Sequence, residues 1–438
     1  MLVTADRVFG GHLYVRNGKI AAISDDGTLP AREELDAAGL YVLPGMLDCH
    51  AHINDPGFTW REDLPHASEA AAVGGVTTLI DMPLQNTPPL TSADAFANKL
   101  AVFEGRSLVD YALWGGLVTD NAAELAGMDA AGAVGFKAFI APVSLGYSSV
   151  DMGLAREALF RIKAFGGLAG FHCEDHALIC AGEAKAKAGG GTRRAFLDSR
   201  PVVAEVIATA NVIELARETG ARVHICHVSH PRVAELVRRA QADGLSVTGE
   251  TCPHYLVFTE ENLLSCGTVF KCAPPLRTAE ARDGLWEYVL DGTLSCIGSD
   301  HSPSRPDEKD EAVHGVMGAW GGLSGLQSLV QVMFDQAVTR HGCSPSLLAR
   351  FASSAARVFG LDGRKGALGV GLDADAVLID PGRAWTITAH SLLNPFSAFE
   401  GLEGVGLPVC TVVRGRVVAR EGNVLAPFGH GLFQPRKP

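Results

Sequence analysis

Two histidines one residue apart follow an apolar run near the start of the chain. The stretch GMLDCHAHINDPG, residues 45–57, places His50 and His52 at positions i and i+2. Such positions point to the same face of a β-strand. Two neutral imidazoles side by side pack poorly in a core, but they form a good pair of ligands for a divalent metal. The spacing therefore predicts part of a metal site whose remaining ligands come from other segments.

Residues of similar chemistry lie in or end several other short apolar runs. They are Lys137 in GFKAFI, His172 in FHCED, His224 and His227 in HICHVSH, and Asp300 in GSDHSP. Because His224 and His227 are three residues apart, a regular strand cannot point both of them inward. His227 is nearer the end of its run and is the predicted ligand, whereas His224 is expected to make a structural hydrogen bond.

Lys137 is the unusual member of this set, because an unpaired ammonium in an apolar strand is costly to bury. One interpretation is that its side chain extends to water at the end of the strand. The other is that its amine is kept neutral and adds carbon dioxide. The resulting carbamate would replace a buried cation with an anionic oxygen ligand that bridges two metals.

The elements that must position these residues alternate regularly between residues 40 and 360. Helical patterns such as PRVAELVRRAQADG, AEARDGLWEYVLDG and PSLLARFASSAARVFG separate short apolar runs. The predicted strands are YVLPGMLDCHAH, GVTTLIDMP, YALWGGLV, AVGFKAFI, GLAGFHCE, RVHICHVS, LSVTGETCPHYL and LSCIGSDHS. Eight strands, each followed by a helix or a long loop, predict an α/β fold, a (β/α)₈ TIM barrel, over residues 45–364. Catalytic residues of such barrels lie at the C-terminal ends of the strands, as most of the candidate ligands do here.

The two ends of the chain have a different pattern. Residues 1–44 and 365–438 contain short strand-like runs and turns, including GGHLYVRNGKIAAIS, DADAVLID and CTVVRGRVVAREGNVL. Neither end has enough apolar residues for a core of its own. We therefore predict one small composite β-sandwich domain formed by both ends beside the barrel.

Composition and charge exclude several classes of partner. The 438 residues carry a net charge of −12 without a basic stripe, which argues against binding to nucleic acid or to an anionic membrane. No apolar stretch has membrane-spanning length, and the N-terminus lacks a signal-peptide pattern. The ten cysteines include no CxxC pair, so they are expected to be reduced, buried residues of a cytoplasmic protein.

Taken together, these residues resemble the cyclic-amide branch of the amidohydrolase superfamily, which contains dihydroorotases, hydantoinases and allantoinases. The resemblance covers nearly the whole chain. It implies two divalent metal ions, expected to be Zn²⁺, with Lys137 carboxylated by CO₂. The implied ligands are His50, His52, Lys137, His172, His227 and Asp300. It also implies that a metal-bridging hydroxide attacks the amide, that Asp300 transfers the proton to the leaving nitrogen, and that the protein is a homotetramer or a homodimer.

Within this branch, four stretches are most similar to allantoinases: KCAPPLR, AWGGLSGLQSLVQVMFDQAV, HCEDHALIC and SRPVVAEV. Dihydroorotases carry an arginine where Asn54 stands, and hydantoinases carry a tyrosine where Pro142 stands. Ser144 or Tyr147 of the following loop is a possible substitute for that tyrosine. In DMPLQNTPP, Gln85 replaces the asparagine that is common in allantoinases.

We therefore expect hydrolysis of allantoin, a neutral ureide, to allantoate. A hydantoinase or dihydropyrimidinase is the main alternative, and a dihydroorotase or a non-catalytic relative is less favoured. Metal content distinguishes the last of these from the enzymes. The expected substrate contacts are Asn54, Ala273, the backbone of Gly321 and Gly322, and His254.

Overall fold

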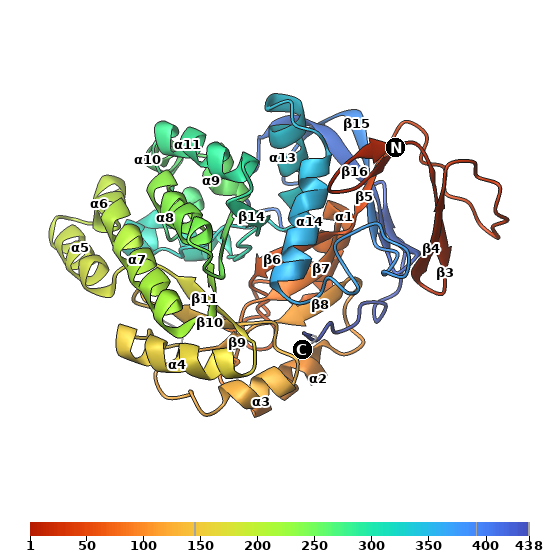
Figure 1. Ribbon diagram of the computed structural model, residues 1–438. Helices are drawn as coiled ribbons and strands as arrows, with labels where there is room; N and C mark the ends of the chain where they lie inside the picture. The colour runs from red at the N-terminus through yellow and green to blue at the C-terminus, as the bar shows by residue number, and fades with distance from the viewer. Residues whose placement is uncertain (144–145, 391, 437–438) are drawn as a thin grey trace.

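The computed structural model describes residues 1–143, 146–390 and 392–436. It contains a parallel barrel and, beside it, a sheet that combines strands from both ends of the chain (Figure 1). In the view of Figure 1 this sheet lies on the right of the barrel, and the N-terminus lies at its upper edge. Both parts of the predicted architecture are confirmed.

The barrel wall consists of two groups of parallel strands. Strands β6–β8 form one group, and β9–β14 form the other. Their bounds are β6 Met46–Ala51, β7 Val76–Asp81, β8 Asp110–Leu113, β9 Gly115–Gly116, β10 Phe136–Phe139, β11 Leu168–His172, β12 Arg222–Ile225, β13 Val247–Thr251 and β14 Leu294–Ile297. The third predicted strand, YALWGGLV, is thus divided into β8 and β9 at Trp114. A parallel bridge between Ala51 and His301 connects the last strand to the first and closes the ring.

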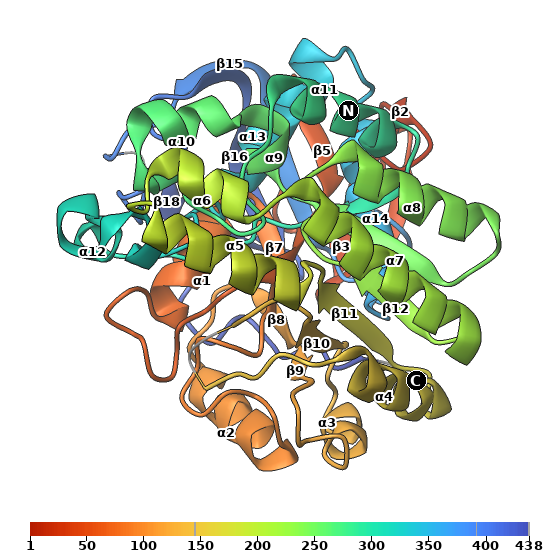
Figure 2. The ribbon, with the colours of Figure 1, turned by 90° about the vertical axis from the view of Figure 1, so that its left-hand side faces the viewer.

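Helices cover the outside of this ring, and Figure 2 shows α5, α6, α7 and α8 along the face turned to the viewer. Their bounds are α1 Leu64–Gly74, α2 Ala93–Phe103, α3 Leu125–Ala130, α4 Met152–Ala164, α5 His176–Ala188, α6 Arg193–Ser199, α7 Val202–Thr219, α8 Pro231–Ala242, α9 Pro253–Val257, α10 Glu260–Cys266, η1 Thr268–Phe270, α11 Ala279–Leu290, η2 Pro306–Lys309, α12 Glu311–Gly318, α13 Leu329–Phe334, η3 Asp335–Arg340 and α14 Ser346–Val358. The three helical patterns quoted above correspond to α8, α11 and α14. In the described residues, no helix combines the length and the hydropathy that crossing a membrane requires.

Helix α8 shows why these segments are helical. Pro231 occupies its first turn, where a missing N–H costs nothing, and the ring of His230 accepts a hydrogen bond from the backbone of Arg232. Val233 and Val237, four residues apart, are fully buried against the barrel. Burial of one apolar stripe therefore fixes the helix to the outer face of the wall.

The end sheet has the order β18-β17-β16-β15-β5-β1-β2. Its strands are β1 Leu2–Val3, β2 Val8–Phe9, β5 Tyr41–Pro44, β15 Ala376–Thr386, β16 Glu403–Val413, β17 Arg416–Arg420 and β18 Asn423–Val424. The hairpin of β3 (His12–Arg16) and β4 (Lys19–Ser24) forms a second layer, with Ile20 buried in the same small core as Leu2 and Leu378. Only Gly45 separates β5 from β6, so the sheet leads directly into the first barrel strand.

A buried charge cluster joins the two parts. The ammonium of Lys365 is fully buried, pairs with Asp110 of β8, and lies 2.9 Å from Asp373 and 2.7 Å from Asp375. Near the C-terminus the chain leaves the end sheet, and Phe433 makes a parallel bridge to Tyr111 of β8. The barrel and the end sheet are therefore connected by charge pairs as well as by the covalent chain.

Candidate metal centre

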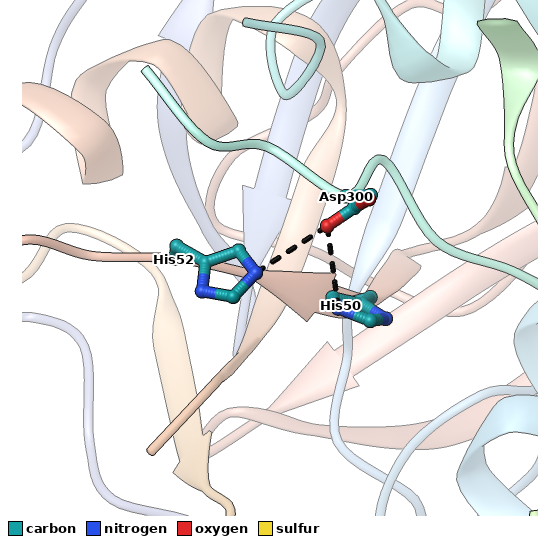
Figure 3. Close-up of side chains that lie close together, drawn as sticks. All are labelled: His50, His52 and Asp300. Carbon is teal, nitrogen blue, oxygen red and sulfur yellow. Dashed lines mark ion pairs between the residues drawn. The ribbon is translucent and has the colours of Figure 1, made fainter. Parts of the chain in front are cut away.

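Three of the predicted ligands meet at one oxygen atom. His50 lies in the buried strand β6, His52 follows that strand by one residue, and Asp300 lies three residues beyond the end of β14. The Nε2 atoms of His50 and His52 each lie 3.3 Å from Oδ1 of Asp300 (Figure 3). Closure of the barrel thus brings together residues that are 250 positions apart in the sequence.

The hydrogen bonds of His50 define which of its nitrogens is free. Its Nδ1 is hydrogen-bonded to Glu250 of β13, a carboxylate that can only accept. Nδ1 therefore carries the proton, and Nε2 presents its lone pair to the carboxylate oxygen of Asp300. The His50 nitrogen and the Asp300 oxygen are both lone-pair donors, so at this distance they require a cation between or beside them. This is the arrangement of ligand atoms in a metal site.

His172 and His227 form a second pair of imidazoles nearby. His172 ends β11 and His227 follows β12 by two residues, and His172 Nδ1 lies 3.1 Å from His227 Nε2. Because His172 Nε2 is 2.7 Å from Glu174, its Nδ1 is the atom with the free lone pair. The ring centres of His50 and His227 are 5.2 Å apart, so the two pairs of histidines are adjacent.

Lys137 lies in β10 with its ammonium fully buried and without a hydrogen-bond partner. The interpretation that it extends to water is therefore wrong: the wall of the barrel encloses it. Burial and then the charge of Lys137 lower the pKa of His50 and His227. An orphaned, buried amine beside these imidazoles fits the carbamate interpretation, since a carbamate would convert the charge that repels metal ions into a ligand.

The electrostatics keep the candidate ligands in forms that bind metal. Burial also lowers the pKa of His172, so His50, His172 and His227 are held neutral and their lone pairs are available. Burial disfavours the carboxylate of Asp300, but His50, His52 and His254 outweigh that effect and lower the pKa of Asp300 to about 2. Asp300 is thus an anion at neutral pH.

Two of these residues also have strained backbones. His227 has φ of 38° and Asp300 has φ of 47°, in the left-handed region that non-glycine residues rarely adopt. Such conformations cost roughly 1–3 kcal/mol each and persist where the surrounding structure enforces them. The surrounding structure therefore holds both residues in these conformations at a cost in stability.

The structure also shows where the predicted substrate contacts lie. Asn54 is fully buried and its Oδ1 has no partner, while Ala273 is half-buried. The amide of Gly322 donates to the carbonyl of Lys271 at 3.0 Å, so its N–H is already engaged. Tyr147 donates its hydroxyl to the carbonyl of Lys137 at 2.5 Å, and Ser144 lies outside the described residues.

The predicted strand LSVTGETCPHYL, which contains His254, extends too far toward the C-terminus. Strand β13 ends at Thr251, and Pro253 begins α9, because proline suits the first turn of a helix and cannot donate to a sheet. His254 is buried in that turn with both ring nitrogens unpartnered, and burial lowers its pKa to about 4. By contrast, His224 has the predicted structural role, with Nδ1 2.8 Å from Thr248 and Nε2 3.1 Å from Glu250.

A polar cluster that the sequence analysis did not identify lies two residues from Asp300. Gln85 has φ of 62°, and its amide group donates to Ser302 at 3.2 Å while its Oε1 lacks a partner. Gly322 packs so tightly on the same serine that a Cβ would lie 2.4 Å from Ser302 Oγ. No local sequence pattern predicts this cluster, because Gln85, Ser302 and Gly322 come from three separate loops.

Two buried carboxylates were also missed. Glu174 holds His172 and is itself paired with Arg200, and Glu250 holds His50. For Glu250 a signal was present in the sequence, because a charged residue inside the strand VTGET is as anomalous as Lys137 inside GFKAFI. Applying the same criterion to both strands would have identified it.

Comparisons with known proteins identify the family to which this chain belongs. The family model described as "Amidohydrolase family" matches residues 41–418. A protein named "Allantoinase" from Rubrobacter xylanophilus is 39% identical over 428 residues, which cover 97% of this chain and 94% of the relative. The "Allantoinase" of Escherichia coli K12 is 38% identical over 435 residues, with 96% and 94% coverage.

Among solved structures, an L-hydantoinase (dihydropyrimidinase) from Arthrobacter aurescens superposes with a TM-score of 0.96 and is 37% identical. The match covers 99% of this chain and 98% of that one. A dihydropyrimidinase from Brevibacillus agri has a TM-score of 0.93 at 28% identity, with 99% and 97% coverage. Sequence and structure thus point to one group of related proteins.

Proposed function

The chain belongs to the amidohydrolase family, and from this premise we propose that it hydrolyses the cyclic amide of allantoin to allantoate. The observation that carries the hydrolytic chemistry is the convergence of the His50 and His52 Nε2 atoms on one oxygen of Asp300, beside the unpartnered ammonium of Lys137. Full-length relatives named allantoinase support the choice of substrate.

Members of this family generally hold a binuclear metal centre, and the residues present fit one. We propose that His50, His52 and Asp300 hold one ion, that His172 and His227 hold the other, and that both share carboxylated Lys137. Nitrogen and oxygen donors of this kind suit Zn²⁺. When bound, the ions would polarise the amide carbonyl and make hydroxide available near neutral pH.

Asp300 is the residue proposed to move the proton. Its low pKa keeps it ionised, so it can accept a proton from the attacking nucleophile and then donate that proton to the leaving ring nitrogen. Its position on a short loop at the mouth of the barrel leaves the side chain 14% exposed, so it can reach a bound substrate. The left-handed backbone at Asp300 fixes the direction in which it points.

The proposed substrate contacts are neutral polar groups. Asn54 and Gln85 each have an unpartnered amide oxygen that could accept a ureide N–H, and His254 has two free ring nitrogens. Ala273, Gly321 and the carbonyl of Gly322 would contribute backbone groups. An anionic substrate such as dihydroorotate needs a fixed cation, and Asn54 cannot neutralise a carboxylate.

A panel of cyclic amides tests this proposal. We expect kcat/KM for allantoin to exceed that for dihydroorotate by at least about 10²-fold, which is roughly 2.7 kcal/mol of transition-state discrimination. Dihydrouracil and simple hydantoins should lie between them, because they share the ring amide but lack the ureido group. Faster hydrolysis of dihydroorotate than of allantoin would refute the assignment.

A second candidate function is that of a hydantoinase. The structural likeness to the Arthrobacter aurescens L-hydantoinase favours it specifically, since both chains are matched almost completely. A higher kcat/KM for an unsubstituted or 5-substituted hydantoin than for allantoin would establish this alternative.

Two further proposals concern the setting of the enzyme. We propose a homotetramer or homodimer, which light scattering on the purified protein tests directly. We also propose a cytoplasmic location. All ten cysteines are free thiols in the structure, which suits a reducing compartment, and fractionation of the source cells would check this.

A further inference from the structure

The carboxylate of Glu250 is the centre of a hydrogen-bond network beneath the candidate metal centre. The residue lies in β13 and is fully buried. One oxygen, Oε1, accepts from His50 Nδ1 and from the backbone N–H of His227, the latter at 3.2 Å. The other, Oε2, accepts from the thiol of Cys49 at 3.0 Å and from His224 Nε2 at 3.1 Å. One side chain thus links β13 to residues of β6, of β12 and of the loop that follows β12.

The first pair of contacts reaches both halves of the candidate centre. The bond to His50 fixes the tautomer in which Nε2 faces Asp300 and His52. The bond to the N–H of His227 holds the peptide whose left-handed conformation aims that imidazole at His172. Carboxylates that orient metal-ligating histidines in this way also make the imidazole a stronger donor.

Glu174 provides a contrast within the same site. Its carboxylate contacts His172 and Arg200, and in the described residues it contacts none of the ligands from β6 or the β14 loop. Its influence should therefore be restricted to the ion held by His172 and His227. Glu250, in contrast, touches one ligand of each ion.

We propose that Glu250 is a positioning residue shared by both metal sites, which sets the tautomer of His50 and the backbone of His227 together. The inference rests on the metal centre of the proposed function and is independent of which cyclic amide is hydrolysed. Its signature is that loss of one carboxylate weakens the binding of two ions.

The decisive variant is Glu250→Gln. A glutamine keeps the volume and one acceptor oxygen for His50 and His227, and His224 can change tautomer to accept from the new amide because its Nδ1 can donate to Thr248. The fold should therefore survive, while the negative charge is lost. The readouts are Zn²⁺ dissociation constants from competition with a chromophoric chelator and the visible spectrum of the Co²⁺-loaded protein.

We expect Glu250→Gln to weaken binding of both equivalents by roughly 10–100-fold and to change the Co²⁺ bands. Glu174→Gln should weaken one equivalent only. Glu205→Gln is the matched control for loss of a buried carboxylate, since Glu205 pairs with Arg277 and Ser229 outside the site. Thr248→Val removes the other partner of His224 and should leave both constants within about 3-fold of wild type.

Wild-type affinity for two ions with an unchanged Co²⁺ spectrum in Glu250→Gln, or weakening of one equivalent only, would overturn the proposal. If Glu250→Gln does not fold, Glu250→Asp replaces it: withdrawal of the carboxylate by one methylene should weaken both equivalents, and unchanged binding overturns the inference. A wild-type protein that binds two ions but does not act on allantoin refutes the proposed substrate alone. A wild-type protein that binds no ion refutes the metal centre, and the role of Glu250 with it.

Discussion

At the scale of single residues, the site contains several buried polar atoms that make no hydrogen bond within the protein. Lys137 is buried without a partner, His52 has an unpartnered Nδ1, and His227 has an unpartnered Nδ1. Buried polar groups in folded proteins nearly always have partners, so this group of orphaned atoms is unusual and fits the proposed site. The predictions for Lys137 and Asp300 belong to this scale.

Lys137→Ala should abolish metal binding and activity, because it removes the ligand proposed to be shared by both ions. Short carboxylates such as acetate should partly restore activity by occupying the space of the carbamate. Metal analysis and turnover with and without acetate measure this. Lys163→Ala, on the outer helix α4, is the control and should behave as wild type. Full metal content and turnover in Lys137→Ala would contradict the bridging role.

Asp300→Asn should retain most of the metal but lose the proton acceptor. We expect kcat to fall by at least the ~10²-fold typical of a lost general acid–base. Because the amide cannot take up the proton, the loss should persist across the accessible pH range. Steady-state kinetics together with metal analysis separate the two effects, and turnover near the wild-type rate would exclude this function of Asp300.

At the scale of elements, loops after different strands pack against one another around the mouth of the barrel. Gly322 lies against Ser302, which follows Asp300 by two residues, and the amide of Gly322 is bound by the carbonyl of Lys271. The loop after β14 and the segment after α12 therefore pack directly against each other. Asp300 lies two residues before Ser302 on the first of these segments.

Gly322→Ala should disturb that packing. The added Cβ would lie 2.4 Å from Ser302 Oγ and 2.9 Å from the Ser302 carbonyl, so the loop must shift. Overpacking of this kind costs about 1–3 kcal/mol, and a displacement near 1 Å can lower kcat/KM by up to ~10²-fold. Kinetics and thermal unfolding check both values.

Gly318→Ala is the matched control for this loop. Its nearest neighbour beyond the adjacent residues would be His314 Cβ at 3.6 Å, an ordinary contact. It should therefore leave kcat/KM and stability close to those of wild type. Equal behaviour of the two alanine variants would show that the contact with Ser302 does not constrain the site.

At the scale of the whole molecule, buried ion pairs connect the end sheet to the barrel. Lys365 is fully buried and pairs with Asp110 of the barrel and with Asp373 and Asp375 near the end sheet. Asp110 also pairs with Arg414, at the turn between β16 and β17. Removal of the central cation leaves Asp375 without an ion-pair partner among the described residues and takes one of two cationic partners from Asp110 and from Asp373.

Lys365→Met should therefore lower the free energy of unfolding by about 3–5 kcal/mol, as when one partner of a buried ion pair is lost. Lys19→Met is the matched control. Lys19 lies 2.7 Å from the same Asp373, but its side chain is 48% exposed, so its loss should cost at most about 1 kcal/mol. Urea unfolding of both variants measures the difference, and similar midpoints would contradict the proposed function of the cluster.

The sequence by itself determined much of this site, because local spacing fixes the direction of side chains along a strand. The i, i+2 spacing of His50 and His52, and the residues at or just beyond the ends of β11, β12 and β14, indicated five of the six proposed ligands. Lys137 stood out because an ammonium in an apolar strand needs an explanation. The eight strands and the sheet from both chain ends likewise followed from the periodicity of apolar residues.

Only the tertiary structure decided which distant residues contact or hydrogen-bond to one another. The contact between Glu250 and His50 spans 200 positions, and that between Gly322 and Ser302 joins two loops, so neither leaves a local pattern. The helix that contains His254 was also predicted wrongly. Its residues continue the apolar pattern of the preceding strand, and only the structure shows that Pro253 begins a new helix. Tautomers, orphaned atoms and strained backbones depend on the closure of the barrel, which places distant strands side by side and excludes the water that would otherwise satisfy these groups.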